Sequence, residues 1–202
     1  MLQLFKPDLD QREINAVTRV LRSGWIGSGS RVEEFEQQFA KFVGAKYAVA
    51  VSSASSALQL ALQALNLKPN AQVISPSLTF IATSHAILLN QLTPVFCDID
   101  PDTLCADPQD IAQKITPKTK AMIVMHYGGH PVDLDPLVKL CHHQKIHLIE
   151  DCAHADGSFY KGKHVGTFGT MGCFSFAAIK YITTGDGGMI ITNSKKLAAH
   201  LK

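Results

Sequence analysis

A lysine near the C-terminal end of the chain has the surroundings that imine chemistry requires. In the segment CFSFAAIKYITTGDGGMIIT, residues 173–192, Ser175 belongs to an apolar run and Lys180 begins the loop that follows it. Apolar neighbours lower the pKa of a lysine by desolvation, and the neutral amine is the form that condenses with an aldehyde. A lone loop lysine is ordinarily solvated, so this interpretation of Lys180 depends on the rest of the pattern.

The segment HLIEDCAHADGS places two carboxylates and an imidazole at the end of another apolar run, namely Glu150, Asp151 and His154. An aspartate beside a pyridine nitrogen keeps that nitrogen protonated, and the cation is an electron sink for carbanion chemistry. A metal site is the alternative, but Asp151 and His154 have no clear third ligand in the sequence. We therefore predict no metal.

Two earlier segments suit the other parts of a phosphorylated aromatic cofactor. SSASSAL, residues 52–58, enters a helix, where free backbone N–H groups and the hydroxyls of Ser55 and Ser56 suit a phosphate. An ordinary helix cap is the simpler alternative there. SPSLTFIAT, residues 75–83, places Phe80 where a strand becomes a helix, so its ring could stack on a planar cofactor or pack in the core.

These residues follow short apolar runs that alternate with helical patterns, which predicts a three-layer α/β/α fold with a mainly parallel, mixed sheet. Ligand sites in such sheets lie beyond the carboxyl ends of the strands. The predicted strands are 47–51, 73–75, 95–98, 121–126, 147–150, 173–176 and 189–192, and the predicted helices between them are 57–65, 80–89, 108–115 and 134–144.

An N-terminal helical segment, residues 1–44, precedes this alternation. Asp10 is expected to cap a helix that ends before Gly24, and Ser30 with Glu33 forms the capping-box pattern of a second helix. We treat 1–202 as one cofactor-binding large domain, because no linker or repeat divides the chain.

The composition excludes several classes of protein. A formal charge of +2 gives no field that favours nucleic acid or an anionic membrane, and no apolar run reaches the length of a membrane span. Five cysteines without a CxxC pair favour a reducing compartment, and acidic residues near the N-terminus argue against a signal peptide. We therefore expect a cytoplasmic protein.

Taken together, the segments resemble the sugar-nucleotide aminotransferases of the DegT/DnrJ family, which are fold-type I pyridoxal-phosphate enzymes. The resemblance runs nearly end to end, and the order and spacing of the motifs are more specific than any one of them. It is carried by SGWIGSGSRVEEFE, SSASSALQLAL, PSLTFIAT, PVFCDID, HYGGHPVDLDPL, EDCAHADGS and FSFAAIKYITTGDGGM.

The resemblance implies a role for each candidate residue. Lys180 matches the lysine that bonds to pyridoxal 5'-phosphate and moves the proton, and Asp151 matches the partner of the pyridine nitrogen. The remaining matches are His154 beside the 3′-oxygen, Phe80 stacked on the ring, and Ser55, Ser56 and Ser175 at the phosphate. The implied reaction transfers the amino group of glutamate to a nucleotide-linked keto-deoxy-sugar for surface polysaccharide or glycoconjugate biosynthesis, in a homodimer with shared active sites.

Two departures from the family pattern leave alternatives open. Ala177, Ala178 and Ile179 stand where many relatives have His-Pro, and family members are roughly twice as long, so we expect a C-terminal small domain to be absent. Another fold-type I activity, such as a lyase or sugar dehydratase, and a non-catalytic remnant are the alternatives. Related dehydratases have a histidine in place of Lys180, so the lysine favours transamination.

Overall fold

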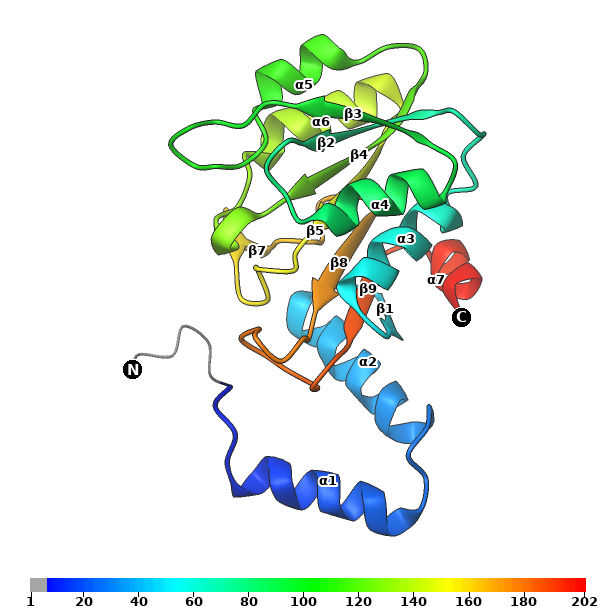
Figure 1. Cartoon of the computed structure of the whole chain (residues 1–202), viewed down its shortest axis with the longest axis vertical. Coiled ribbons are helices and arrows are strands. Elements are labelled where there is room, and N and C mark those ends of the chain that lie inside the picture. Colours follow the sequence, from blue (N-terminus) through cyan, green and yellow to red (C-terminus); the bar gives the residue numbers. More distant parts are fainter. Residues whose placement is uncertain (1–6) are drawn as a thin grey trace.

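A seven-stranded sheet forms the centre of the computed structural model, which describes residues 7–202 (Figure 1). Its strands lie in the order β1-β9-β8-β5-β4-β2-β3. Their bounds are β1 Tyr47–Val51, β2 Gln72–Pro76, β3 Thr93–Cys97, β4 Thr119–Met125, β5 His147–Asp151, β8 Met171–Ser175 and β9 Gly188–Thr192. All seven predicted strands are present, each within about two residues of its predicted bounds.

The sheet is mixed, as predicted. Strands β3, β2, β4, β5 and β8 run parallel, whereas β9 pairs antiparallel with both β8 and β1. The carboxyl ends of β4, β5 and β8 therefore meet at one edge of the sheet, where the segments after each strand come together.

Helices cover both faces of the sheet and make it the middle of three layers (Figure 1). The helices α2 Ser30–Val43, α5 Pro108–Lys114 and α6 Leu134–Gln144 supply buried residues to the apolar cluster on one face. On the other face, α3 Ala54–Ala64 and α4 Ile81–Leu89 do the same, and α7 Lys195–Leu201 packs beside them. The three-layer α/β/α prediction is confirmed.

All five cysteines are buried free thiols.

The N-terminal cap predicted from the sequence is present in the first helix and absent from the second. Asp10 caps α1 Gln11–Ser23 with a complete capping box, and Gly24 ends it in the left-handed conformation. The capping box predicted at Ser30 is wrong, because Gly29 is the N-cap of α2 and Ser30 is already helical. Residues 1–6 of the predicted N-terminal segment lie outside the described residues.

Helix α1 lies away from the sheet (Figure 1) and has no buried residue. Its apolar stripe, Ile14, Val17 and Leu21, is more than half exposed at each position. The pattern that predicted the helix thus marks an amphipathic surface and not a contribution to the core.

Two small features were not predicted. A 3₁₀ turn, η1 Tyr127–Gly129, follows β4, and the two-residue strands β6 Phe159–Tyr160 and β7 Lys163–His164 pair as a hairpin before β8. Both are too short to produce a periodic apolar pattern. They shape the loops that approach the carboxyl edge of the sheet.

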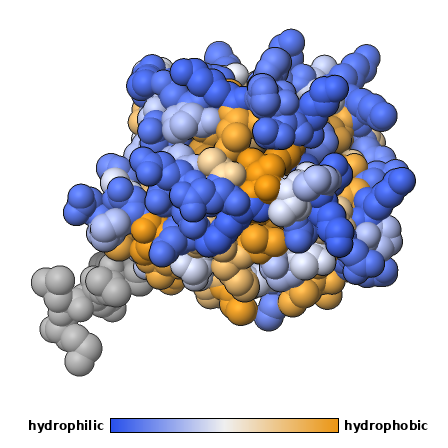
Figure 2. Space-filling model, turned by 90° about the horizontal axis from the view of Figure 1, so that it is seen from above, coloured by the Kyte–Doolittle hydropathy of each residue, from blue (hydrophilic) through white to orange (hydrophobic). Residues whose placement is uncertain are grey.

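Figure 2 views the molecule from the side of the edge strand β3 and of α5. Hydrophobic side chains are visible there between hydrophilic ones. Strand β3 is the edge strand there, and Phe96 within it is half exposed. Among the helices of residues 7–202, none has the length and apolarity needed to cross a membrane.

Candidate active site

A cavity of about 460 Å³ lies at the carboxyl ends of β4, β5 and β8. Of the seven site residues predicted from the sequence, the structure brings six together in its lining and leaves out Ser56. The six are Ser55, Phe80, Asp151, His154, Ser175 and Lys180.

Lys180 lies in the loop between β8 and β9, partly buried, with its backbone N–H donating to the carbonyl of Ala177 at 2.9 Å. Burial lowers the pKa of its amine, and the charges of Asp151 and Asp156 oppose this shift. The direction is the one that increases the neutral, nucleophilic form.

Asp151 ends β5 and is only 2% exposed. Its Oδ1 accepts the backbone N–H of Ala153 at 3.1 Å, and its Oδ2 lies 3.4 Å from the hydroxyl of Thr83. Burial raises the pKa of this carboxyl, while the Ala153 N–H, the charge of Lys180 and the Thr83 hydroxyl lower it. A cation at the open side of the carboxylate would therefore stabilise the ionised form.

His154 is held in the turn after β5. The N–H of Gly128 donates to its Nδ1 at 3.4 Å, so the neutral ring carries its proton on Nε2. Burial, followed by the charge of Lys180, lowers the pKa of His154. The ring thus has an N–H available to donate to an oxygen in the cavity.

The N-terminus of α3 supplies the polar end of the cavity. Ser53 caps the helix by accepting the N–H of Ser56 at 3.1 Å, and Ser55 faces the cavity. The hydroxyl of Ser56 instead contacts the hydroxyls of Ser52 and Ser53, at 2.9 and 3.1 Å. The helix-cap interpretation is confirmed by Ser53, and the same turn forms a polar wall of the cavity.

Strand β9 lies directly against this turn because it begins with glycine. A Cβ at Gly188 would lie 2.4 Å from the carbonyl carbon of Ser53, too close for any side chain. Ser175, 5% exposed, ends β8 beside it and accepts the N–H of Ala177 at 3.5 Å. The close approach of the two backbones fixes the polar wall of the cavity.

Phe80 is the N-cap of α4, and 66% of the residue is exposed. Core packing, the simpler interpretation of this residue, is therefore wrong. Phe80 lines the cavity.

Several lining residues were not singled out as site residues from the sequence, among them Thr79, Met125, Tyr127 and Asp186. Thr79, Met125 and Tyr127 lie at or just after the carboxyl ends of strands, which is the signal that could have found them. Asp186 lies in the same loop as Lys180 and adds a second carboxylate to the wall.

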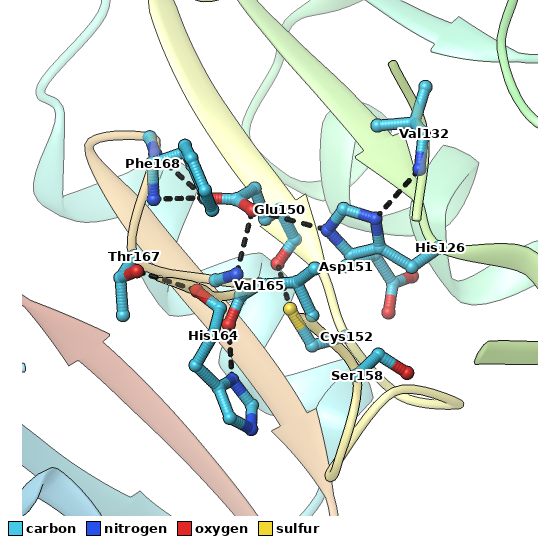
Figure 3. Close-up of polar contacts among 12 residues, drawn as sticks. His126, Val132, Glu150, Asp151, Cys152, Ser158, His164, Val165, Thr167 and Phe168 are labelled. Atoms are coloured by element: carbon cyan, nitrogen blue, oxygen red, sulfur yellow. Dashed lines mark hydrogen bonds and ion pairs between the residues drawn. The ribbon is translucent and has the colours of Figure 1, made fainter. Parts of the chain in front are cut away.

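Glu150 precedes Asp151 but does not line the cavity. Figure 3 shows its carboxylate between His126 and the loop that precedes β8. It accepts the N–H groups of Gly166, Phe168 and Gly169 at 2.7, 2.8 and 2.7 Å, and Nε2 of His126 lies 3.2 Å away. Since the N–H of Val132 donates to Nδ1 of His126, the ring must donate to Glu150 through Nε2. This carboxylate joins β4, β5 and the loop.

The fold defines a class. The mixed, mainly parallel seven-stranded sheet with its helices matches solved fold-type I pyridoxal-phosphate enzymes. The model of the DegT/DnrJ/EryC1/StrS aminotransferase family matches residues 7–202, and the chain belongs to that family. The resemblance found in the sequence is confirmed.

Known proteins of this family are similar along almost the whole chain. The spore coat polysaccharide biosynthesis protein SpsC of Bacillus subtilis is 42% identical over 97% of the chain and 50% of the relative. The crystal structure of an aminotransferase from Psychrobacter cryohalolentis is 39% identical with a TM-score of 0.94, over 98% of this chain and 51% of that one.

A third relative has a different activity in its name. The GDP-4-keto-6-deoxy-D-mannose-3-dehydratase of E. coli, solved with bound hydrated pyridoxal phosphate, is 33% identical with a TM-score of 0.96, over 100% of this chain and 53% of that one. The chain thus spans about half the length of the relatives it matches.

Proposed function

We propose that this chain forms the cofactor site of a pyridoxal-phosphate-dependent aminotransferase that acts on nucleotide-linked keto-sugars. The observation that carries the proposal is the shared cavity of Lys180 and Asp151. It combines an amine whose pKa is lowered by burial with a buried carboxylate that keeps lone pairs free.

The remaining lining residues suit the other parts of this cofactor. The N-terminus of α3, Ser55 and Ser175 would hold the phosphate, because free N–H groups and hydroxyls at a helix start bind dianions. Phe80 would stack on the ring, and Nε2–H of His154 would donate to the 3′-oxygen. We assign Ser56 the supporting role of fixing Ser52 and Ser53 by hydrogen bonds.

When bound, pyridoxal phosphate supplies an aldehyde for the amine and a ring that withdraws electrons from the reacting carbon. Lys180 would be the group that moves the proton, because its Nζ lies in the same cavity and can accept a proton and release it again. Asp151 would keep the pyridine nitrogen of the bound cofactor protonated. Apolar lining residues such as Leu58, Leu78 and Met125 exclude water from the transfer.

The substrates in the proposal are glutamate and a nucleotide-linked keto-deoxy-sugar. Glutamate gives up its amino group, takes the keto oxygen from one water molecule and leaves as 2-oxoglutarate, and the sugar carbonyl oxygen leaves as one water molecule when the sugar amine forms. The name of SpsC supports a role in surface polysaccharide biosynthesis, and the name of the E. coli relative supports a nucleotide-linked keto-sugar. A cytoplasmic homodimer with shared active sites belongs to the same proposal.

The first test is a visible absorbance spectrum of the chain with pyridoxal phosphate, before and after glutamate. We expect a band that glutamate bleaches and that Lys180→Ala abolishes, with the glutamate-dependent rate lower by about 10²–10⁴-fold. Borohydride reduction followed by peptide mass mapping should place the label on Lys180. Lys139→Ala on the exposed side of α6 is the matched control and should leave the band unchanged.

Other outcomes separate the alternatives. A band that glutamate does not bleach, in a protein that converts a keto-sugar nucleotide without an amino donor, would support a dehydratase or lyase. A label on other lysines instead of Lys180 would refute the assignment. If only a chain extended to the length of its relatives gives the band, the cofactor site requires the additional residues.

A further inference from the structure

Asp151 is in contact with a buried threonine that neither sequence pattern nor cavity lining identifies. Thr83 is in the first turn of α4, fully buried, and its hydroxyl lies 3.4 Å from Oδ2 of Asp151. Behind it, the hydroxyl of Thr79 lies 3.0 Å from that of Thr83. The Thr83–Asp151 distance exceeds the usual range of about 2.5–3.0 Å for hydroxyl donors, and a small rotation of the carboxyl would shorten it.

The contacts of Thr79 favour one direction of hydrogen-bond donation, from Thr79 through Thr83 to Asp151. Thr79 Oγ1 also lies 3.3 Å from the sulfur of Met125, which is a weak acceptor. With Asp151 ionised, Thr79 donates to Thr83 and Thr83 donates to Asp151, so both bonds have oxygen acceptors. A protonated Asp151 could still accept from Thr83, but a hydrogen bond to a neutral carboxyl group is weaker than one to a carboxylate. The ionised carboxylate therefore has the better hydrogen bonds.

We propose that Thr83, supported by Thr79, is a positioning residue that orients Asp151 toward the cavity and keeps it ionised for the pyridine nitrogen. The inference rests on the proposed cofactor site but concerns a contact present without the cofactor. The hydroxyl opposes the effect of burial, which raises the pKa of Asp151. It leaves the remaining lone pairs of the carboxylate free.

Other ionisable groups also surround Asp151. Lys180 approaches from the loop before β9, His154 from the turn after β5, and His126 from the end of β4. Glu150 precedes it in the strand, and the thiols of Cys152 and Cys173 lie beside it. A variant of Thr83 changes none of these groups, so its effect isolates the hydroxyl.

The test is a pH titration of the Asp151 carboxyl by carbon-detected NMR in the cofactor-free chain. Thr83→Val removes the hydroxyl at nearly constant volume, and we expect the ionisation constant of Asp151 to fall about tenfold. Thr83→Ser should restore it. Ser84→Ala, on the next residue of α4, is the matched control, since its hydroxyl makes none of the hydrogen bonds found among the described residues.

A second readout is the dissociation constant of pyridoxal phosphate, which should rise about tenfold in Thr83→Val and recover in Thr83→Ser. An unchanged Asp151 titration in folded Thr83→Val overturns the inference even if the cofactor binds. A shifted titration in a chain that binds no cofactor supports the inference while the proposed function fails. If Thr83→Val does not fold, Thr79→Val must give a smaller shift in the same direction.

Discussion

Glu150 and Asp151 are neighbours in β5, yet their carboxylates have different surroundings on the two faces of the strand. Glu150 has four donors around it, from three backbone N–H groups and His126. Asp151 has two, one of them at 3.4 Å. A carboxylate has about four lone-pair sites, so Glu150 is satisfied by its own chain and Asp151 is not. Proximity in sequence therefore does not separate a structural carboxylate from one available to a ligand, whereas the number of donors does.

A third carboxylate extends the comparison. Asp156 is 2% exposed, and neither of its oxygens has a hydrogen-bond partner among the described residues. The three side chains thus have four, two and no donors. The largest effects on the free energy of unfolding are expected at the two ends of this series.

The first prediction concerns Glu150→Gln, which we expect to destabilise the fold by about 3–5 kcal/mol. The amide places an NH₂ group where an oxygen accepted backbone N–H donors, so donors face donors in a buried site. Urea unfolding of the variant measures the loss. A cost below about 1 kcal/mol would show that the four donors around Glu150 are dispensable and would remove the basis of the comparison.

The second prediction concerns Asp156→Asn, which should stabilise the fold in a pH-dependent way. Burial raises the pKa of Asp156 to about 7 from the ordinary 3.8. Because the unfolded chain releases this proton at lower pH than the folded one, stability falls as pH rises between these values. We expect a gain on the order of 2 kcal/mol at pH 8 and almost none at pH 4.

Thermal unfolding at the two pH values tests this second prediction. Asp102→Asn, on an exposed turn, is the matched control and should change stability little at either pH. A gain in Asp156→Asn that is equal at pH 4 and pH 8 would contradict the assignment of Asp156 as a buried carboxyl without donors.

The third and smallest effect is expected for Asp151→Asn, below about 1 kcal/mol in stability. The amide oxygen can still accept the N–H of Ala153, and the NH₂ group can donate to Thr83. Affinity for pyridoxal phosphate should nevertheless fall by at least about tenfold, because the charged partner of the ring is lost. Urea unfolding and a cofactor titration of the same variant test both parts. A loss of stability equal to that of Glu150→Gln would contradict the distinction between the two faces.

The layers and most of the site could be predicted because they depend on local patterns. Apolar runs indicated every strand of the sheet, and Asp10 and Gly24 marked the ends of α1. Asp151 ends β5 and Lys180 follows β8, and the carboxyl ends of these strands meet on one side of the sheet, so their shared cavity follows from the topology.

What could not be predicted depends on contacts between distant segments or on competition between nearby ones. The donors to Glu150 come from a loop 16 to 19 residues further along the chain. Ser55 and Ser56 are equivalent in the sequence, but the helical turn directs only Ser55 into the cavity and Ser56 toward Ser52 and Ser53. At α2, Gly29 takes the cap position that the pattern gave to Ser30.

The position of the antiparallel strand β9 late in the chain affects how the protein folds during its translation. It separates β1 from β8, and Tyr47 of β1 pairs with Thr192 at its far end. The serine turn after β1 rests on Gly188, so it lacks this contact until β9 has left the ribosome. At about 5–20 residues per second, this interval lasts on the order of ten seconds. The nascent chain therefore carries this serine turn for that interval before the backbone of β9 is present to pack against it.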